Sequence, residues 1–140
     1  MKNLVLVLTI ALASIVNFSA KAQSTEDQST STVTKTADIE VYYFHNTRRC
    51  ATCNAVEQVT RETLEESYPE QMKSGVITFQ SLNIEEGETE ALAKNLGVSG
   101  QTLLIVKGDK KTDLTNDAFM YARTKPDKLK EKVKNAIDQD

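Results

Sequence analysis

The sequence predicts an α/β domain, a three-layer α/β/α sandwich built around a mixed four-stranded sheet. Apolar, β-branched segments first alternate with segments of helical periodicity, and this alternation requires a mainly parallel sheet with right-handed crossovers. A turn signal, Gly108-Asp109-Lys110, then separates two adjacent strand-like segments. These two segments should pair as a hairpin that adds an antiparallel edge. The expected order of elements is therefore β-α-β-α-β-β-α.

Residues 1–22 of the 140-residue chain read as a signal peptide. Lys2 supplies the positive start, residues 4–16 are an uncharged apolar run, and Ala20-Lys21-Ala22 gives the small-x-small cleavage pattern. A membrane-spanning helix needs roughly 20 apolar residues, so the run is short for an anchor. We therefore expect cleavage near Ala22, no stable membrane anchor afterwards, and a periplasmic or secreted bacterial protein. The alternative is an uncleaved anchor.

Residues 23–36 are rich in Ser and Thr and contain almost no large apolar side chains. Such a segment buries too little surface to offset the entropy of ordering, so we expect a flexible tether. The folded domain should then span residues 37–140, a common size for one hydrophobic core.

Residue patterns predict the elements of this domain in order. Residues 39–44 are β-branched and aromatic, which predicts a strand buried on both faces. A helix from Cys50 to about Tyr68 has apolar residues at helical spacing and should stop at Pro69. The other predicted elements are a strand at 75–82, a helix at 86–96, strands at 101–107 and 111–116, and a last helix beginning near Pro126.

The two cysteines of the chain, Cys50 and Cys53, are separated by two residues. They close too small a ring to restrict the unfolded chain much, which favours chemistry over stapling. Cys50 falls at the start of the predicted helix, where the dipole and free N–H groups stabilise an attacking thiolate. Arg48 and Arg49 add positive charge there. Cys53, one turn further on the same face, should be the more buried, resolving sulfur.

Two other interpretations of the cysteine pair remain open. One is an inert local disulfide, and the other is half of a zinc site. Zinc normally takes four ligands, whereas the chain offers Cys50, Cys53 and its single histidine, His45, so we expect no metal. His45 itself either shares the thiolate's charge and shuttles a proton, or is a surface histidine at a strand end.

Composition restricts the partners. The net charge is −3 and no strongly basic stretch lies outside the C-terminal tail, so nucleic acid is not an expected partner. No G-x-G-x-x-G motif is present for a flavin or nicotinamide cofactor, and we expect none.

Two segments resemble the thioredoxin superfamily. Residues 44–53 (FHNTRRCATC) lie at a strand-to-helix junction, and residues 96–103 (LGVSGQTL) are similar to the segment that faces the redox cysteines of thioredoxins. The resemblance covers residues 37–140. It implies the sheet order 4-3-1-2 with the third strand antiparallel, a redox-active disulfide between Cys50 and Cys53, and substrate contacts at Gln101 and Thr102.

A narrower resemblance rests on residues 42–53, YYFHNTRRCATC. This string resembles a small exported bacterial family described as thioredoxin-like nitrophenyl-compound nitroreductase subunits and associated with arsenic-resistance gene clusters. The resemblance implies a partner redox subunit, because any hydride chemistry would have to reside there.

The chain also departs from ordinary thioredoxins. Ala51-Thr52 replaces Gly-Pro between the cysteines, Arg49 replaces a Trp, Gln101 stands about where a cis-proline holds substrate, and no acid lies near Phe44. We expect an exported thiol–disulfide oxidoreductase with a protein or small-molecule thiol or disulfide client. The alternative is a non-catalytic accessory subunit or a soft-metal or arsenic-linked thiol-binding protein. Arsenite prefers three thiolates, and this chain supplies two.

Overall fold

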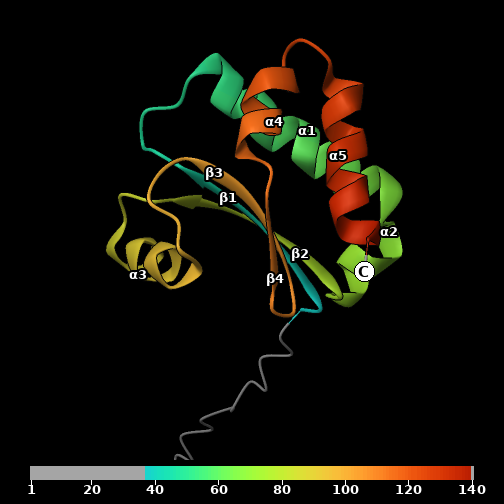
Figure 1. Ribbon diagram of the computed structural model, residues 1–140, viewed down its shortest axis with the longest axis horizontal. Coiled ribbons are helices and arrows are strands. Elements are labelled where there is room, and N and C mark those ends of the chain that lie inside the picture. The colour runs from blue at the N-terminus through green and yellow to red at the C-terminus, as the bar shows by residue number, and fades with distance from the viewer. Residues whose placement is uncertain (1–36, 140) are drawn as a thin grey trace, which may run out of the picture. The chain divides into compact units, whose positions relative to one another are not determined.

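A four-stranded mixed sheet forms the centre of the computed structural model, which describes residues 37–139 (Figure 1). The predicted signal peptide and tether, residues 1–22 and 23–36, lie outside these described residues. The strands are β1 (Ile39–His45), β2 (Ile77–Asn83), β3 (Thr102–Lys107) and β4 (Lys110–Asp113).

The sheet order is β2-β1-β3-β4. Strand β1 pairs in parallel with β2 and antiparallel with β3, and β4 pairs antiparallel with β3. Tyr43 therefore lies between Ser81 on β2 and Leu103 on β3. The α/β class, the order 4-3-1-2 and the antiparallel third strand are confirmed.

Helices cover both faces of the sheet (Figure 1). They are α1 (Ala51–Ser67), α2 (Pro69–Ser74), α3 (Gly87–Leu96), α4 (Thr115–Tyr121) and α5 (Pro126–Asp138). Helix α3 lies on one face, and α1, α4 and α5 lie on the other (Figure 1).

Two short helices, α2 and α4, were not predicted, so the expected order β-α-β-α-β-β-α is incomplete. Pro69 does follow the end of α1 but also opens α2, a position that suits its fixed φ and missing N–H. The strand predicted at 111–116 ends at Asp113. Asp113 Oδ1 accepts a hydrogen bond of 2.8 Å from the Thr115 N–H, which satisfies a backbone donor at the start of α4.

Strand β1 is buried on both faces, as its composition predicts. Val41 and Tyr43 belong to the larger core beneath α1, α4 and α5, while Tyr42 and Phe44 belong to a smaller core beneath α3. Among the described residues, no helix is both long enough and apolar enough to cross a membrane.

We predict that Leu103→Ala lowers the free energy of unfolding by about 2–5 kcal/mol, because Leu103 is fully buried in β3 and truncation leaves a cavity. Chemical denaturation of the reduced protein measures this loss. The control is Met120→Ala, whose side chain is 59% exposed and which should change stability by less than about 0.5 kcal/mol. Equal effects of the two substitutions would contradict the packing described for the larger core.

Candidate functional site

Cys50 is the N-cap residue of α1, and its sulfur accepts a hydrogen bond of 3.1 Å from the Cys53 N–H. Its backbone is extended, with φ −96° and ψ 165°. The sulfur therefore satisfies one of the free N–H groups that every helix N-terminus leaves. The same contact would stabilise a thiolate, because negative charge is favoured at this end of the helix dipole.

Cys50 and Cys53 form a disulfide, with their Cα atoms 5.0 Å apart. Cys50 is exposed, whereas Cys53 is only 2% exposed. The predicted difference in burial is confirmed, and it leaves the Cys50 sulfur as the one that an external thiol or disulfide can reach.

Gln101 is brought to the disulfide by the loop that precedes β3. Its Oε1 lies 3.4 Å from Cys53 Sγ. The neighbouring Thr102 hydroxyl donates instead to the Gly100 carbonyl at 3.1 Å, within its own loop. Of the two residues for which substrate contacts are expected, the structure thus places Gln101 against the buried cysteine.

Arg49, immediately before Cys50, directs its guanidinium to Glu57 and Tyr43. Its Nη2 donates to Glu57 Oε2, and its Cζ lies 5.6 Å from the centre of the Tyr43 ring. Arg61 donates to the other oxygen of Glu57 at 3.1 Å. Burial of Glu57 raises its carboxyl pKa, but the hydrogen bond and charge of Arg49, with further contributions from Ser81 and Arg61, outweigh this and leave the pKa below its ordinary value.

His45 lies at the end of β1, where its Nδ1 is 3.0 Å from the Asn46 carbonyl oxygen. Its ring is 5.9 Å from the Tyr43 ring, measured between centroids. Its own carbonyl accepts a hydrogen bond of 2.8 Å from the Ile84 N–H. These contacts are those of a strand-end histidine that joins β1 to the loop after β2.

The loop between β1 and α1 is fastened to the loop between β2 and α3. The Thr47 N–H donates to Glu85 Oε2 at 3.2 Å, and Asn83 Nδ2 donates to Thr47 Oγ1 at 2.9 Å. The hydrogen bonds from Thr47 lower the carboxyl pKa of Glu85. These hydrogen bonds fasten the backbone just before the N-terminus of α1.

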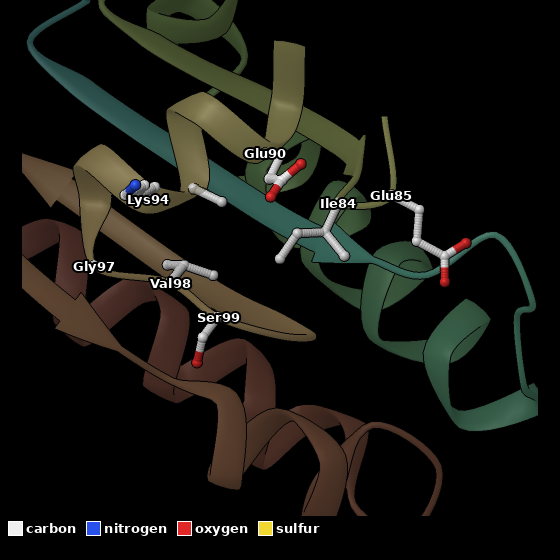
Figure 2. A pocket seen from close by; sticks show the side chains of 8 residues that line it. Ile84, Glu85, Glu90, Lys94, Gly97, Val98 and Ser99 are labelled. Carbon is white, nitrogen blue, oxygen red and sulfur yellow. The ribbon is translucent and has the colours of Figure 1, made fainter. Parts of the chain in front are cut away.

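A cavity of about 750 Å³ lies on the α3 side of the sheet (Figure 2). Its lining residues are Ile84, Glu85, Glu90, Ala93, Lys94, Gly97, Val98 and Ser99. Ser99 precedes Gln101 by two residues, so one wall of the cavity continues into the loop that contacts Cys53. The disulfide itself does not line the cavity.

Sequence analysis did not identify Glu57, Arg61 or Tyr43 as parts of this site. Helical spacing contained the signal, because Glu57 follows Cys53 by four residues and Arg61 follows Glu57 by four. Residues four apart lie on one helix face. Within residues 37–139, no group of three or more His, Cys, Asp or Glu side chains is arranged to hold a metal ion.

No family model matches the chain, and no curated protein matches it. Among solved structures it is similar to thioredoxin O2 from Arabidopsis thaliana in the oxidised state, with 29% identity and a TM-score of 0.42 over 56% of this chain and 65% of the other. The match thus spans just under two thirds of that thioredoxin.

Two further solved structures are similar. A mutant thioredoxin from Halobacterium salinarum is 23% identical with a TM-score of 0.48, over 74% of this chain and 78% of the other. A malarial protein is 15% identical with a TM-score of 0.39, over 59% and 92% of the respective chains.

The chain's own topology and disulfide define its class. A mixed sheet of order β2-β1-β3-β4, with a C-x-x-C disulfide at the N-terminus of α1, is the arrangement of a thioredoxin-like fold.

We predict that acid weakens the fold in part through Glu57. Its folded-state carboxyl pKa lies below the ordinary value of 4.5. The stabilisation is therefore complete above the unfolded-state pKa and is lost as the pH falls through the folded-state pKa. Denaturation midpoints measured from pH 6 to pH 3 should fall less steeply for Glu57→Gln than for the unaltered protein. Glu65→Gln, an exposed change on the same helix, should leave the slope unaltered. An unaltered slope in Glu57→Gln would contradict the assignment.

Proposed function

We propose that this chain is an exported thiol–disulfide oxidoreductase whose Cys50–Cys53 pair exchanges electrons with a thiol or disulfide client. One observation carries the proposal. The exposed Cys50 sulfur caps α1 and accepts the Cys53 N–H, while Cys53 is buried directly behind it. This arrangement favours a thiolate at the reachable sulfur and keeps a second sulfur in position to release the client.

In the reducing direction, the Cys50 thiolate attacks one sulfur of a client disulfide. A bond forms between Cys50 Sγ and that sulfur, and the other client sulfur leaves as a thiolate and takes up a proton. Cys53 then loses its proton and attacks Cys50 Sγ, which releases the second client thiolate. The client gains two electrons and the cysteine pair becomes a disulfide. The same steps in reverse oxidise a dithiol client. A dithiol partner re-reduces the pair after the first direction, and a disulfide partner re-oxidises it after the second.

Gln101 supports the resolving step in this proposal. Its Oε1 is 3.4 Å from Cys53 Sγ, so in the reduced protein it would accept a hydrogen bond from the Cys53 thiol. That bond favours the protonated form of Cys53 until the mixed disulfide has formed. A client segment would lie beside Gln101 and Thr102 at the start of β3, next to the exposed Cys50.

The competing function is an accessory subunit, of a nitroreductase for instance, or a thiol site for a soft ion such as arsenite. Burial of Cys53 favours redox exchange over ion capture, because a chelated ion needs both sulfurs to be reachable. A third thiolate would also have to come from another molecule, since the chain has two cysteines. The remaining alternative, an accessory subunit with an inert cysteine pair, is tested by the reduction potential of that pair.

We predict a reduction potential for the Cys50–Cys53 couple between about −120 and −270 mV, with fast exchange against a model disulfide. Equilibration with glutathione or a dithiol buffer, followed by separation of the two redox forms, gives the potential. A potential below about −300 mV with slow exchange would mark a structural disulfide and contradict the oxidoreductase proposal.

We also predict that Cys53→Ser accumulates mixed disulfides with clients, because it removes the resolving sulfur and leaves the attacking one. Cys50→Ser is the matched control and should trap none. Non-reducing gels, with mass spectrometry of the trapped species, make the comparison. Preferential trapping by Cys50→Ser would reverse the two roles.

Export gives a separate prediction, namely that the processed protein begins near Gln23. Intact mass and N-terminal sequencing of protein from fractionated bacteria test it. Leu6→Arg interrupts the apolar run of the leader and should leave unprocessed protein in the cytoplasm. A full-length chain in the membrane fraction would contradict cleavage.

A further inference from the structure

Three charged side chains form a continuous ion-pair network directly beside the reactive helix terminus. Glu57 accepts a hydrogen bond from Arg49 at Oε2 and another from Arg61 at Oε1. The side chains of Arg49 and Glu57 are only 24% and 22% exposed, so solvent screens this pair less than a surface ion pair. The Arg61 guanidinium lies 4.8 Å from the centre of the Phe79 ring, which holds the outer end of the network against β2.

Glu57 is the residue that fixes the position of Arg49. Arg49 Nε is buried without a hydrogen-bond partner, and so is the Tyr43 hydroxyl beside it. The guanidinium is therefore held by its Nη2 bond to Glu57 and by the Tyr43 ring. Loss of the Glu57 charge would leave the ring contact and at most a neutral, weaker hydrogen bond as restraints on the guanidinium.

This position matters because Arg49 adjoins Cys50 in the chain. A free guanidinium at that place would approach the Cys50 thiolate and stabilise it. In the structure the guanidinium instead faces the Glu57 carboxylate, whose negative charge offsets part of the positive charge of the two arginines that it pairs with. We propose that Glu57 is a positioning residue that restrains the reactivity of Cys50 by holding the Arg49 guanidinium at its own carboxylate and by adding a negative charge there. The inference rests on the proposed thiol–disulfide exchange for its significance in the cell.

Other charged groups lie near Cys50 and stay constant in the test. Arg48 precedes Arg49 in the same loop, and His45 ends β1. From the neighbouring loop, Glu85 is bonded to the Thr47 N–H. From the loop before β3, the neutral side chain of Gln101 contacts Cys53.

The size of the effect follows from geometry. Glu57 is seven residues beyond Cys50, or about 10 Å along the helix axis. At that distance and an effective dielectric constant of about 40, removal of one negative charge lowers the apparent pKa of the Cys50 thiol by about half a pH unit. Release of Arg49 toward Cys50 adds to this shift. The ratio of thiolate to thiol at fixed pH should rise about threefold or more.

The experiment measures the alkylation rate of Cys50 against pH in the reduced processed protein, with the modified site identified by peptide mass. Glu57→Gln should shift the profile to lower pH by about half a unit or more. Glu65→Gln is the matched control, since it removes the same charge from an exposed site on α1 about 22 Å along the helix from Cys50. An unshifted Glu57→Gln profile would overturn the inference.

Arg49→Met tests whether Glu57 acts through Arg49. In the unaltered protein this substitution should raise the apparent pKa by about half a unit, because it removes one positive charge held beside Glu57, at a distance from Cys50 comparable to that of Glu57. In the Glu57→Gln background the rise should be clearly larger. Equal rises in the two backgrounds would overturn positioning through Arg49. If Glu57→Gln does not fold, the Arg49→Met variant alone tests the inference. A rise of a full unit in the apparent pKa of the Cys50 thiol, measured in that variant, would refute it.

The equilibrium with glutathione gives a second readout. Glu57→Gln should make the disulfide about threefold easier to reduce relative to glutathione at neutral pH, since it stabilises the thiolate product. Failure of the proposed function would show differently, as slow exchange with every model disulfide in the unaltered protein. The pH profile of Cys50 alkylation would still report on Glu57 in that case.

Discussion

The pairing of β1 with β2 on one side and β3 on the other determines where every part of the site lies. Because β1 and β2 are parallel, their carboxyl ends meet at one edge of the sheet. Because β3 is antiparallel to β1, its amino end lies at the same edge. The loop that leads to Cys50, the loop that holds Thr47 through Glu85, and the loop that places Gln101 on Cys53 therefore converge there.

Two positively charged groups lie at this edge next to Cys50, the N-terminus of α1 and the side chain of Arg49. The N-terminus of α1 favours negative charge on the sulfur that caps it. The arginine next to Cys50 would add to that effect, but its guanidinium is directed to Glu57. The N-terminus of α1 is thus in direct contact with the Cys50 sulfur, whereas the guanidinium of the neighbouring arginine is paired with a carboxylate.

Much of the fold follows from sequence periodicity, because long segments that bury one or both faces carry a clear pattern. Strand β1 and helix α1 are of this kind. Helices α2 and α4 have six and seven residues, too few for a periodic stripe, and the proline before α2 reads equally as the end of one helix or the start of another. At the site, the cysteine pair was evident from spacing. The pairing of Arg49 with Glu57 was not evident, because the sequence alone does not determine the direction in which a long side chain extends.

The sulfur that caps α1 also links folding to oxidation state. In the disulfide, Cys50 offers the Cys53 N–H a weak neutral acceptor, whereas in the dithiol form a thiolate would offer a charged one. The two redox forms then begin the same helix with caps of unequal strength. By thermodynamic linkage, any extra stability that the cap confers on the reduced fold, relative to its unfolded chain, appears as an equal gain in oxidising power of the disulfide. The stability of the N-terminus of α1 in each redox form therefore contributes to the reduction potential of the Cys50–Cys53 pair.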